Sequence, residues 1–330
     1  MPDEDYPGCS EIIRQAFASR GTPSDVIPTL LQSLSENTRK QYNTTYKYWW
    51  RFCKQKAFDP FHGGINEVLQ FLNHLFHNTT NAFGTFNSHR SALALILPGD
   101  IGTDRSIKRF LKGICRLRPS RPKYEFTWDT DVVLSYLAKA HPVLQIPLKM
   151  LTYKLCTLLA LITGQRIQTL SLIRVSNIHQ SNTRIQIRIT DPTKTSLAAS
   201  AQPCLQIPFF TARPELCVAS TLLEYLDRTS PLRTQEDFLF LTVRQPHRRA
   251  HKETISKWIK TTLAQAGIDI SIFTPHSTRH AATSAALRKG VSLNTIQQTA
   301  GWSKKSEIFQ KFYNRPVCES DSFARAILTT

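Results

Sequence analysis

The sequence has few of the features that mark secreted, membrane-bound or zinc-dependent proteins. Its seven cysteines are scattered and odd in number, and none forms a C-x-x-C pair, so we expect reduced thiols inside a cell and neither a disulfide framework nor a metal site. No apolar run approaches the roughly 18 residues that a membrane span needs. The acidic start, MPDEDY, does not resemble a signal peptide. We therefore predict an intracellular protein without a membrane partner.

Acidic residues are also scarce. The 330 residues include 24 Asp and Glu against 42 Lys and Arg, which gives a formal net charge of +18. Both halves of the chain share this excess, so it does not come from a detachable tail. Hydrophobic residues still make up 41% of the chain, which is enough for a packed core. A basic folded protein of this kind is expected to bind a polyanion, and nucleic acid is the commonest one.

The first half of the chain has helical periodicity. Residues 1–22 have no strong pattern and are expected to form a flexible tail. Apolar residues then recur at helical spacing, with Ser35 as one expected N-cap, over 24–34, 35–57, 65–78, 82–97 and 104–118. We predict a helical DNA-binding domain over 23–120. The stretch RPSRPKYEF, rich in proline and charge, leads into a linker that we assign to 121–128.

The second half mixes helices with short strands. The segment RIQIRIT (184–190) alternates with the period of two that a half-buried strand shows, and CLQIPFF (204–210) is its expected partner, with a turn around 191–202 between them. Helical patterns surround this pair at 131–140, 147–164, 217–228, 253–266, 277–289, 292–300 and about 306–313. The predicted fold class is therefore mainly α with a small β-sheet, and residues 129–330 form its α+β domain.

Six residues suited to phosphate chemistry follow one another along this second domain. A helix N-terminus with an added guanidinium is a ready anion site, and the segment TPHSTRHAATSAALRKG begins in this way. The other members of the set lie in LITGQRIQ, DPTKTS, AGWSKK and FQKFYNRP. Each residue taken singly has an ordinary structural interpretation, but the ordered set is specific. The six are Arg166, Lys194, His276, Arg279, Trp302 and Tyr313.

In this order the chain resembles the tyrosine recombinases, the lambda-integrase and Cre-like group of DNA-cutting and rejoining enzymes. The resemblance covers about 130–316, and its wording is closest to the recombinases of DIRS-type retroelements. It implies a catalytic tyrosine recombinase domain preceded by a helical core-binding domain. It also implies double-stranded DNA as partner, a tetramer on paired sites, no cofactor, and integration of a mobile element in the nucleus.

Cutting a phosphodiester needs a nucleophile, an acid for the leaving group and neutralisation of growing negative charge. Arg166 and Arg279 are the expected neutralising pair, because each guanidinium offers a planar fork of donors to phosphate oxygens. Tyr313 would attack phosphorus and form a 3′-phosphotyrosyl link. A free phenol has a pKa near 10, so it needs help, which we expect from His276. No carboxylate cluster near these motifs indicates a metal.

The remaining members of the set have supporting roles, and the motifs depart from the family in three places. Lys194 would protonate the departing 5′ oxygen, and Trp302 would donate its indole N–H to a phosphate oxygen. Thr169 stands where relatives usually have an acid that supports the first arginine. Trp302 occupies a position where histidine is commoner. Tyr313 follows Trp302 at a longer spacing than in many relatives, so its helix is expected to be offset.

Two other functions stay open at this point. One is a DNA-binding protein derived from a recombinase whose catalysis has been lost, and the other is a type IB topoisomerase-like enzyme with a similar residue set. His280 either supports the site or merely caps its helix. The histidine pairs at 74 and 77 and at 247 and 251 have helical spacing, but without cysteine or carboxylate companions we interpret them as surface imidazoles.

Basic runs and the C-terminal tail complete the set of candidate functional segments. In a DNA clamp the basic runs would contact phosphates, and the candidates are Arg105, Lys108, Arg109, Lys112, Arg116, Arg118, Arg244, Arg248, Arg249 and Lys252. The tail CESDSFARAILTT has an apolar stripe that includes Phe323 and Ile327. A helix of seven or so residues is too short to be stable alone. The stripe therefore needs a groove, either on its own domain or on a neighbouring subunit, as in the family.

Overall fold

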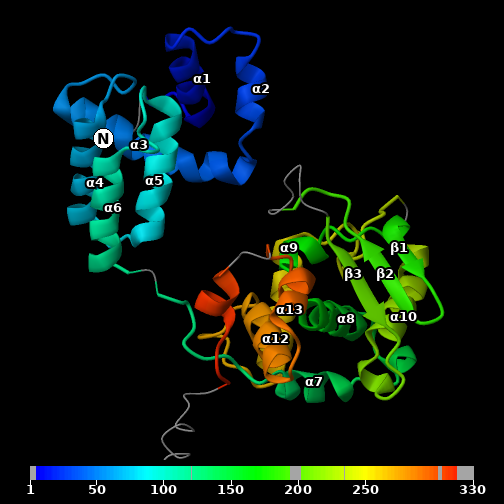
Figure 1. Cartoon of the computed structure of the whole chain (residues 1–330). Helices are drawn as coiled ribbons and strands as arrows, with labels where there is room; N and C mark the ends of the chain where they lie inside the picture. The colour runs from blue at the N-terminus through cyan, green and yellow to red at the C-terminus, as the bar shows by residue number, and fades with distance from the viewer. Residues whose placement is uncertain (1–4, 120, 194–201, 234, 304–306, 318–330) are drawn as a thin grey trace, which may run out of the picture. The chain divides into compact units, whose positions relative to one another are not determined.

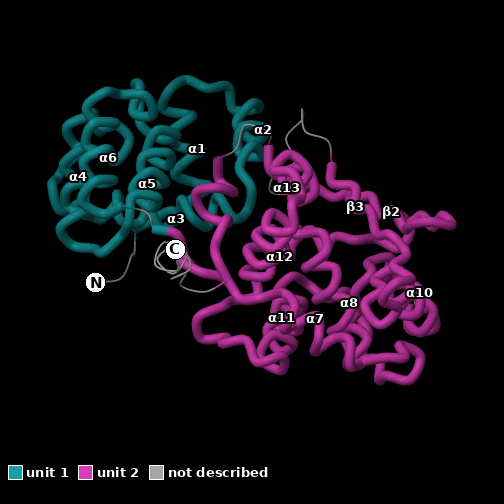
Figure 2. Tube along the Cα trace, turned by 60° about the horizontal axis from the view of Figure 1, so that its bottom comes forward, with its two compact units in different colours: residues 1–121 teal, residues 122–330 magenta. Residues whose placement is uncertain are grey.

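The computed structural model describes residues 5–119, 121–193, 202–233, 235–303 and 307–317. The chain forms two compact units, residues 1–121 and residues 122–330 (Figure 2). Each unit has a hydrophobic core of its own.

Within its described residues, unit 1 is built from α-helices (Figure 1). Polar side chains start two of them: Ser35 accepts a hydrogen bond from the backbone N–H of Thr38, and Asp104 accepts one from the N–H of Ile107. The helices are α1 (Cys9–Ser19), α2 (Ile27–Gln32), α3 (Glu36–Lys56), α4 (Ile65–Asn78), α5 (Phe83–Ile96) and α6 (Arg105–Leu117).

An aromatic cluster forms the centre of unit 1. The Trp49 ring is fully buried, and its centroid lies 5.2 Å from that of Phe71 in an edge-to-face contact. The indole N–H donates to the carbonyl of Pro60, so burial leaves no polar atom of Trp49 unpaired. Gly63 is needed beside this ring, because a Cβ atom there would lie 2.7 Å from it. The packing of α3 and α4 is thus fixed around one tryptophan.

The prediction of a flexible tail over residues 1–22 is wrong for the 11 residues of α1. Residues Cys9–Ser19 form α1, and Ile12, Ile13 and Ala16 of this helix are buried in the core of unit 1. Burial of this apolar face stabilises the helix, which is too short to be stable alone in water. The tertiary contacts with α3 and α5 decide the structure here.

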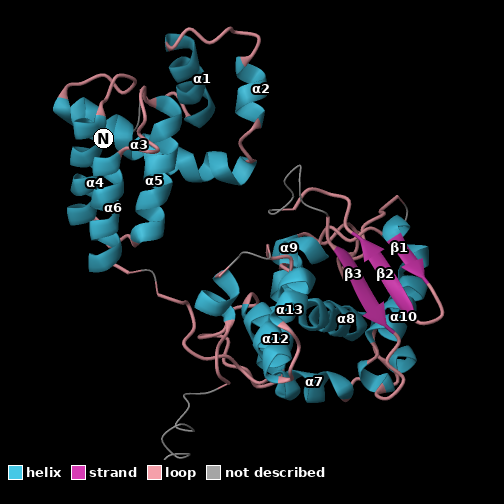
Figure 3. Cartoon of the chain, viewed as in Figure 1, coloured by secondary structure: helices cyan, strands magenta, loops and turns pink. Residues whose placement is uncertain are grey.

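Unit 2 combines helices with one small antiparallel sheet (Figure 3), so the predicted fold class is confirmed. The sheet has the order β1-β2-β3, and its inward-facing isoleucines and leucine pair across β2 and β3. The strands are β1 (Ile178–Gln180), β2 (Arg184–Arg188) and β3 (Cys204–Pro208). The helices are α7 (Thr130–Ala138), α8 (Leu148–Thr163), α9 (Ile167–Leu170), α10 (Val218–Thr229), α11 (Lys252–Gln265), α12 (Ser277–Arg288), α13 (Leu293–Ala300) and a π-helix at Phe309–Tyr313.

Helix α8 is the central helix of unit 2. It is buried along most of its length and packs against α10, α11 and α12. Even Lys154 is fully buried on it; the ammonium donates to the carbonyls of Ala140 and Glu215, and burial lowers the pKa of this lysine to about 8. The helix ends at Gly164, whose φ of +57° is the left-handed conformation that glycine adopts without strain. This turn directs the chain into Arg166.

A buried histidine in unit 1 makes stability depend on pH. His89 is 3% exposed, its Nδ1 lies 2.8 Å from the hydroxyl of Thr45, and burial lowers its pKa to about 4. In the unfolded chain the imidazole titrates near 6.5. The contribution of neutral His89 is therefore complete above about pH 6.5 and is lost progressively as the pH falls toward 4.

We expect His89→Gln, which keeps a hydrogen-bonding group but does not titrate, to flatten this dependence. Between pH 7 and pH 5 the variant should lose about 2 kcal/mol less unfolding free energy than the parent. Urea unfolding followed by circular dichroism at both pH values measures this difference. Parallel losses in the two proteins would show that another group is responsible.

Candidate active site

Five of the six residues singled out in the sequence lie in the described part of unit 2; Lys194 lies outside the described residues. The five come from the ends of secondary structure elements. Arg166 precedes α9, His276 and Arg279 begin α12, Trp302 follows α13, and Tyr313 ends the π-helix Phe309–Tyr313. Helix ends expose unpaired backbone groups and side chains together, which suits them to build a site.

The phenol of Tyr313 and the imidazole of His276 are in direct contact. The Nε2 atom of His276 lies 2.9 Å from the Tyr313 hydroxyl, within hydrogen-bonding distance. His276 is exposed at the N-cap of α12, and Tyr313 is partly exposed. An imidazole in this position is able to take the phenolic proton.

Arg279 lies beneath this pair and is 1% exposed. Its Nη1 donates to the carbonyls of Gly164 and Ala300, at 2.5 and 2.6 Å. Its Nε and Nη2 atoms are buried and have no hydrogen-bond partner among the described residues. Burial, followed by the positive charge of Arg166, lowers the pKa of Arg279 to about 9. The site therefore presents buried cationic donors that an anion would satisfy.

Arg166 is held next to this guanidinium by a short turn. It is the partly exposed N-cap residue of α9, and its neighbour Gln165 is buried with its side-chain amide donating to the carbonyl of Thr299. Thr169, where relatives usually have an acid, is buried in α9 and carries no charge. The backbone between α8 and α9, anchored by Gln165, thus positions Arg166 without help from a carboxylate at position 169.

Trp302 packs against both the Arg279 guanidinium and the Tyr313 ring. The Arg279 guanidinium carbon lies 3.8 Å from the Trp302 ring centroid, a cation–π contact that is strengthened by burial. The same ring meets Tyr313 edge-to-face at 4.8 Å and Phe309 at 5.5 Å. The indole therefore supports the guanidinium by stacking.

His280 is part of the site and is not the cap of α12, because the N-cap residue is His276. Its ring is stacked on that of Tyr313, with centroids 4.0 Å apart and planes 17° apart. Burial, together with the positive charges of His276 and Arg279 among others, lowers the pKa of His280 to about 3, so the ring is neutral. Its spacing of four residues from His276 placed both on one face of α12, which was the signal available in the sequence.

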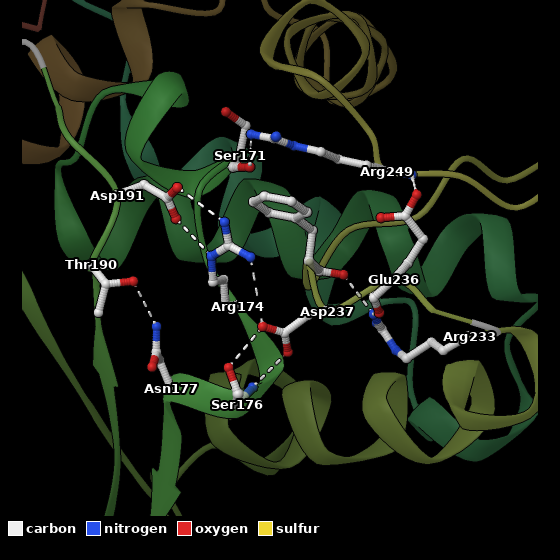
Figure 4. A network of polar contacts seen from close by, with 11 residues as sticks. Ser171, Arg174, Ser176, Asn177, Thr190, Asp191, Arg233, Glu236, Asp237 and Arg249 are labelled. Atoms are coloured by element: carbon white, nitrogen blue, oxygen red, sulfur yellow. Dashed lines mark hydrogen bonds and ion pairs between the residues drawn. The ribbon is translucent and has the colours of Figure 1, made fainter.

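A polar network ties the end of α9 to the end of β2 (Figure 4). Arg174 makes a bidentate ion pair with Asp191, with N–O distances of 2.8 and 3.0 Å. The Phe238 ring lies between two guanidiniums, 4.3 Å from that of Arg174 and 3.5 Å from that of Arg249. Arg249 also donates to the carbonyl of Ser171 at 3.4 Å. The network fixes the chain just before the segment that contains Lys194.

The candidate DNA-contacting residues fall into two groups. Most are exposed; on α6 they lie opposite the buried residues Ile107, Leu111 and Ile114. The side chain of Arg249 is instead engaged in the network just described. That of Arg118 donates to the carbonyls of Phe76 and Thr79 at 2.7 Å and lies 3.9 Å from the Phe76 ring. The exposed group consists of Arg105, Lys108, Arg109, Lys112, Arg116, Arg244, Arg248 and Lys252.

The described ranges contain neither a candidate metal site nor a candidate membrane span. No three His, Cys, Asp or Glu side chains there come together in a way that could hold a metal ion. No helix within those ranges has both the length and the apolar character needed to cross a membrane.

A family model and several solved structures match the chain. The model of the phage integrase family matches residues 132–317. Among solved structures, the site-specific recombinase XerH in a post-cleavage complex with its difH substrate aligns with a TM-score of 0.62 at 13% identity, over 100% of this chain and 99% of that one. No curated protein sequence matches the chain.

Two further solved structures share the fold. The Tn1549 transposon integrase in complex with circular intermediate DNA aligns with a TM-score of 0.55 at 14% identity, over 97% of this chain and 99% of that one. A lambda integrase tetramer bound to a Holliday junction aligns with a TM-score of 0.50 at 14% identity, over 94% and 78%. The fold is that of the tyrosine recombinases. The chain belongs to the phage integrase family.

Two arginines at the end of α6 allow a test of which cationic side chains stabilise the folded state. We expect Arg118→Ala to lower the unfolding free energy by about 2 kcal/mol, because it leaves backbone carbonyls of α4 and its C-terminal turn without their charged donor. Arg116→Ala removes an exposed charge and should change stability by less than about 0.5 kcal/mol. Urea unfolding of both variants measures the contrast; equal effects would show that Arg118 does not anchor the helix end.

Proposed function

We propose that the protein is a site-specific DNA recombinase that cuts and rejoins DNA through a 3′-phosphotyrosyl intermediate. The observation that carries the proposal is the contact of 2.9 Å between the Tyr313 hydroxyl and His276 Nε2, directly beside the buried guanidinium of Arg279. A nucleophile, a base and a cation at one place are what phosphoryl transfer to a side chain requires.

In the proposed reaction the Tyr313 oxygen attacks phosphorus as His276 takes the phenolic proton. The bond from phosphorus to the 5′ oxygen breaks, and Lys194 gives a proton to the departing oxygen. The product is a phosphodiester between Tyr313 and the 3′ end of the cut strand. Because this ester keeps the energy of the broken bond, a 5′ hydroxyl can reverse the reaction and rejoin DNA without ATP.

The two arginines stabilise the negative charge that develops on the non-bridging oxygens. Arg279 is held rigidly by two carbonyls and by the Trp302 ring, so it needs no reorganisation during the reaction. Arg166 adds a second guanidinium that remains accessible from the surface. Trp302 contributes its indole N–H to a phosphate oxygen in addition to its stacking role.

Unit 1 would bind double-stranded DNA through the exposed cations of α6, since Lys and Arg contacts to phosphates provide most of the sequence-independent affinity. Integration of a mobile element in the nucleus is the biological role that the likeness to DIRS-type recombinases suggests. Assembly as a tetramer on paired sites is supported by the lambda integrase tetramer that shares the fold.

A nicked substrate that loses its short 5′ fragment after cleavage tests the function, because the covalent adduct is then trapped. We expect the parent protein to form this adduct and Tyr313→Phe to form none while it keeps its DNA affinity. Denaturing electrophoresis and peptide mass spectrometry identify the adduct and the residue that carries it. A parent protein that binds DNA but forms no adduct would be a DNA-binding derivative, and relaxation of supercoiled DNA without paired sites would indicate a topoisomerase.

The C-terminal segment gives a test of assembly. Residues 318–330 lie outside the described residues, but an apolar pocket with a volume of about 210 Å³ lies between α8, α12 and α13. We propose that this pocket receives the apolar stripe of the segment from a neighbouring subunit. Its lining includes Leu161, Ile162, Ala286, Val291 and Ile296.

Deletion of 318–330 should leave binding to a single site intact and abolish assembly on two sites. Ile162→Asp, which places a charge at the exposed rim of the pocket, should have the same effect. Native gels and light scattering of the DNA complexes distinguish the two states. Full tetramer formation by the shortened chain would reject the docking role, and a lower melting temperature of the free monomer would instead indicate packing within one chain.

A further inference from the structure

The segment that follows the nucleophile is bound to the segment with which unit 2 begins. The backbone N–H of Thr127 donates to the carbonyl of Pro316 at 2.7 Å, and the Nε of Arg315 donates to the carbonyl of Tyr124 at 2.9 Å. These two contacts join residues almost 200 positions apart in the sequence. The chain near Tyr124 and the chain near Tyr313 therefore lie side by side (Figure 1).

Arg315 acts as a clamp on the end of the nucleophile's helix. In addition to the Tyr124 carbonyl, its guanidinium donates to the carbonyls of Lys311 and Asn314, at 2.6 and 2.7 Å. These acceptors are backbone groups of this chain, on both sides of Tyr313 and on the segment with which unit 2 begins. A planar guanidinium can hold several acceptors in fixed directions, which an ammonium cannot. Arg315 is thus engaged in positioning the backbone.

Helix α12 holds the same segment from another side. The hydroxyl of Ser284 donates to the carbonyl of Tyr313 at 2.7 Å and accepts a hydrogen bond from the N–H of Arg315 at 3.1 Å. Arg288 donates to the carbonyl of Arg315 at 3.2 Å. The backbone of the nucleophile is therefore fixed between α12 and the segment with which unit 2 begins.

Tyr124 connects this clamp to the other groups around the phenol. It is 4% exposed, its hydroxyl lies 2.7 Å from that of Thr274, and it accepts a hydrogen bond from the Thr274 N–H at 3.2 Å. Thr274 is two residues before His276, which contacts the nucleophile. The edge of the Tyr124 ring meets His280 at 5.1 Å, and His280 is stacked on Tyr313.

We propose that Tyr124 is a positioning residue for the nucleophile. Its ring supports His280, its hydroxyl holds the loop before His276, and its carbonyl anchors Arg315. Through His280 the first contact acts on the ring of Tyr313, through the loop the second acts on His276, and through Arg315 the third acts on the backbone around Tyr313. Tyr124 does not touch the reacting atoms itself. This inference rests on the proposed function, in which Tyr313 is the nucleophile.

The first experiment compares cleavage with binding. Tyr124→Phe removes the contacts with Thr274 and keeps the ring, whereas Tyr124→Leu also removes the ring. A displacement of about 1 Å at a reacting group can cost 10²-fold in rate. We expect single-turnover cleavage of the nicked substrate to slow by about 10-fold in the first variant and about 10²-fold in the second, with Kd for DNA unchanged.

Arg315→Lys distinguishes a role in holding backbone carbonyls from a role in contacting DNA phosphate, because the variant keeps the charge and loses the planar set of donors. It should slow cleavage nearly as much as Arg315→Ala, and neither variant should change the Kd or its salt dependence. Tyr136 provides the matched control: it is a partly buried tyrosine of α7 whose hydroxyl donates to Gln265 at 3.0 Å, and Tyr136→Phe and Tyr136→Leu should cleave at the parent rate.

A substrate with sulfur in place of the scissile 5′ oxygen shows which side of the reaction is affected. A thiol is far more acidic than an alcohol, so the sulfur leaves without a proton from the enzyme. The cleavage rate of Lys194→Ala should therefore be restored on this substrate. The cleavage rates of the Tyr124 and Arg315 variants should stay low, because these variants impair the attack by Tyr313 and not the departure of the leaving group.

Nitration of Tyr313 by tetranitromethane, followed by peptide mass spectrometry, gives a readout without DNA. The Tyr124→Leu and Arg315→Ala variants should expose the phenol and raise its nitration rate several-fold, and the Tyr136 variants should not. Unchanged nitration together with parent-like cleavage would overturn the inference. A loss of DNA affinity as large as the loss of cleavage rate would also overturn it. Absence of an adduct in the parent protein would refute the proposed function alone, since nitration would still decide whether Tyr124 positions the phenol.

Discussion

The burial of one guanidinium, that of Arg279, is the constraint on which the arrangement of the site depends. Its Nη1 joins the carbonyls of Gly164 and Ala300, which lie at the C-terminal ends of α8 and α13, where a positive charge is favoured by the helix dipoles. Both helices end in a left-handed glycine, Gly164 and Gly301. Three helices, α8, α12 and α13, therefore meet at one charge, and the residues that follow their ends are brought together around it.

Around this charge the side chain of Tyr313 is held mainly by rings. His280 lies under the phenol of Tyr313, and Trp302 contacts its edge, whereas the hydroxyl points to the exposed imidazole of His276. The buried side of the site is packed and neutral apart from Arg279. The open side carries the exposed imidazole of His276 and the partly exposed guanidinium of Arg166. Packing thus provides rigidity on one side and leaves access on the other.

Local sequence patterns predicted most of the helices and the strands β2 and β3, because the buried face of each element appears as apolar residues at regular spacing in the sequence. They did not predict α1, whose apolar face is stabilised by contacts with distant helices, or the three-residue strand β1, which is too short to show a period. The order of the site residues was visible in the motifs. The partners of Arg118 and Arg249 were not, since a sequence shows a charge but not the carbonyl or ring that it meets after folding.

The free donors of Arg279 have a thermodynamic consequence. Among the described residues the Nε and Nη2 atoms have no hydrogen-bond partner, so the folded protein alone retains two unsatisfied buried donors on this cation. An anion that binds there binds the folded state and not the unfolded chain, and mass action then shifts the unfolding equilibrium. Affinity for such an anion and conformational stability are therefore linked through a single side chain. The folded protein is more stable with an anion bound at this position than without one.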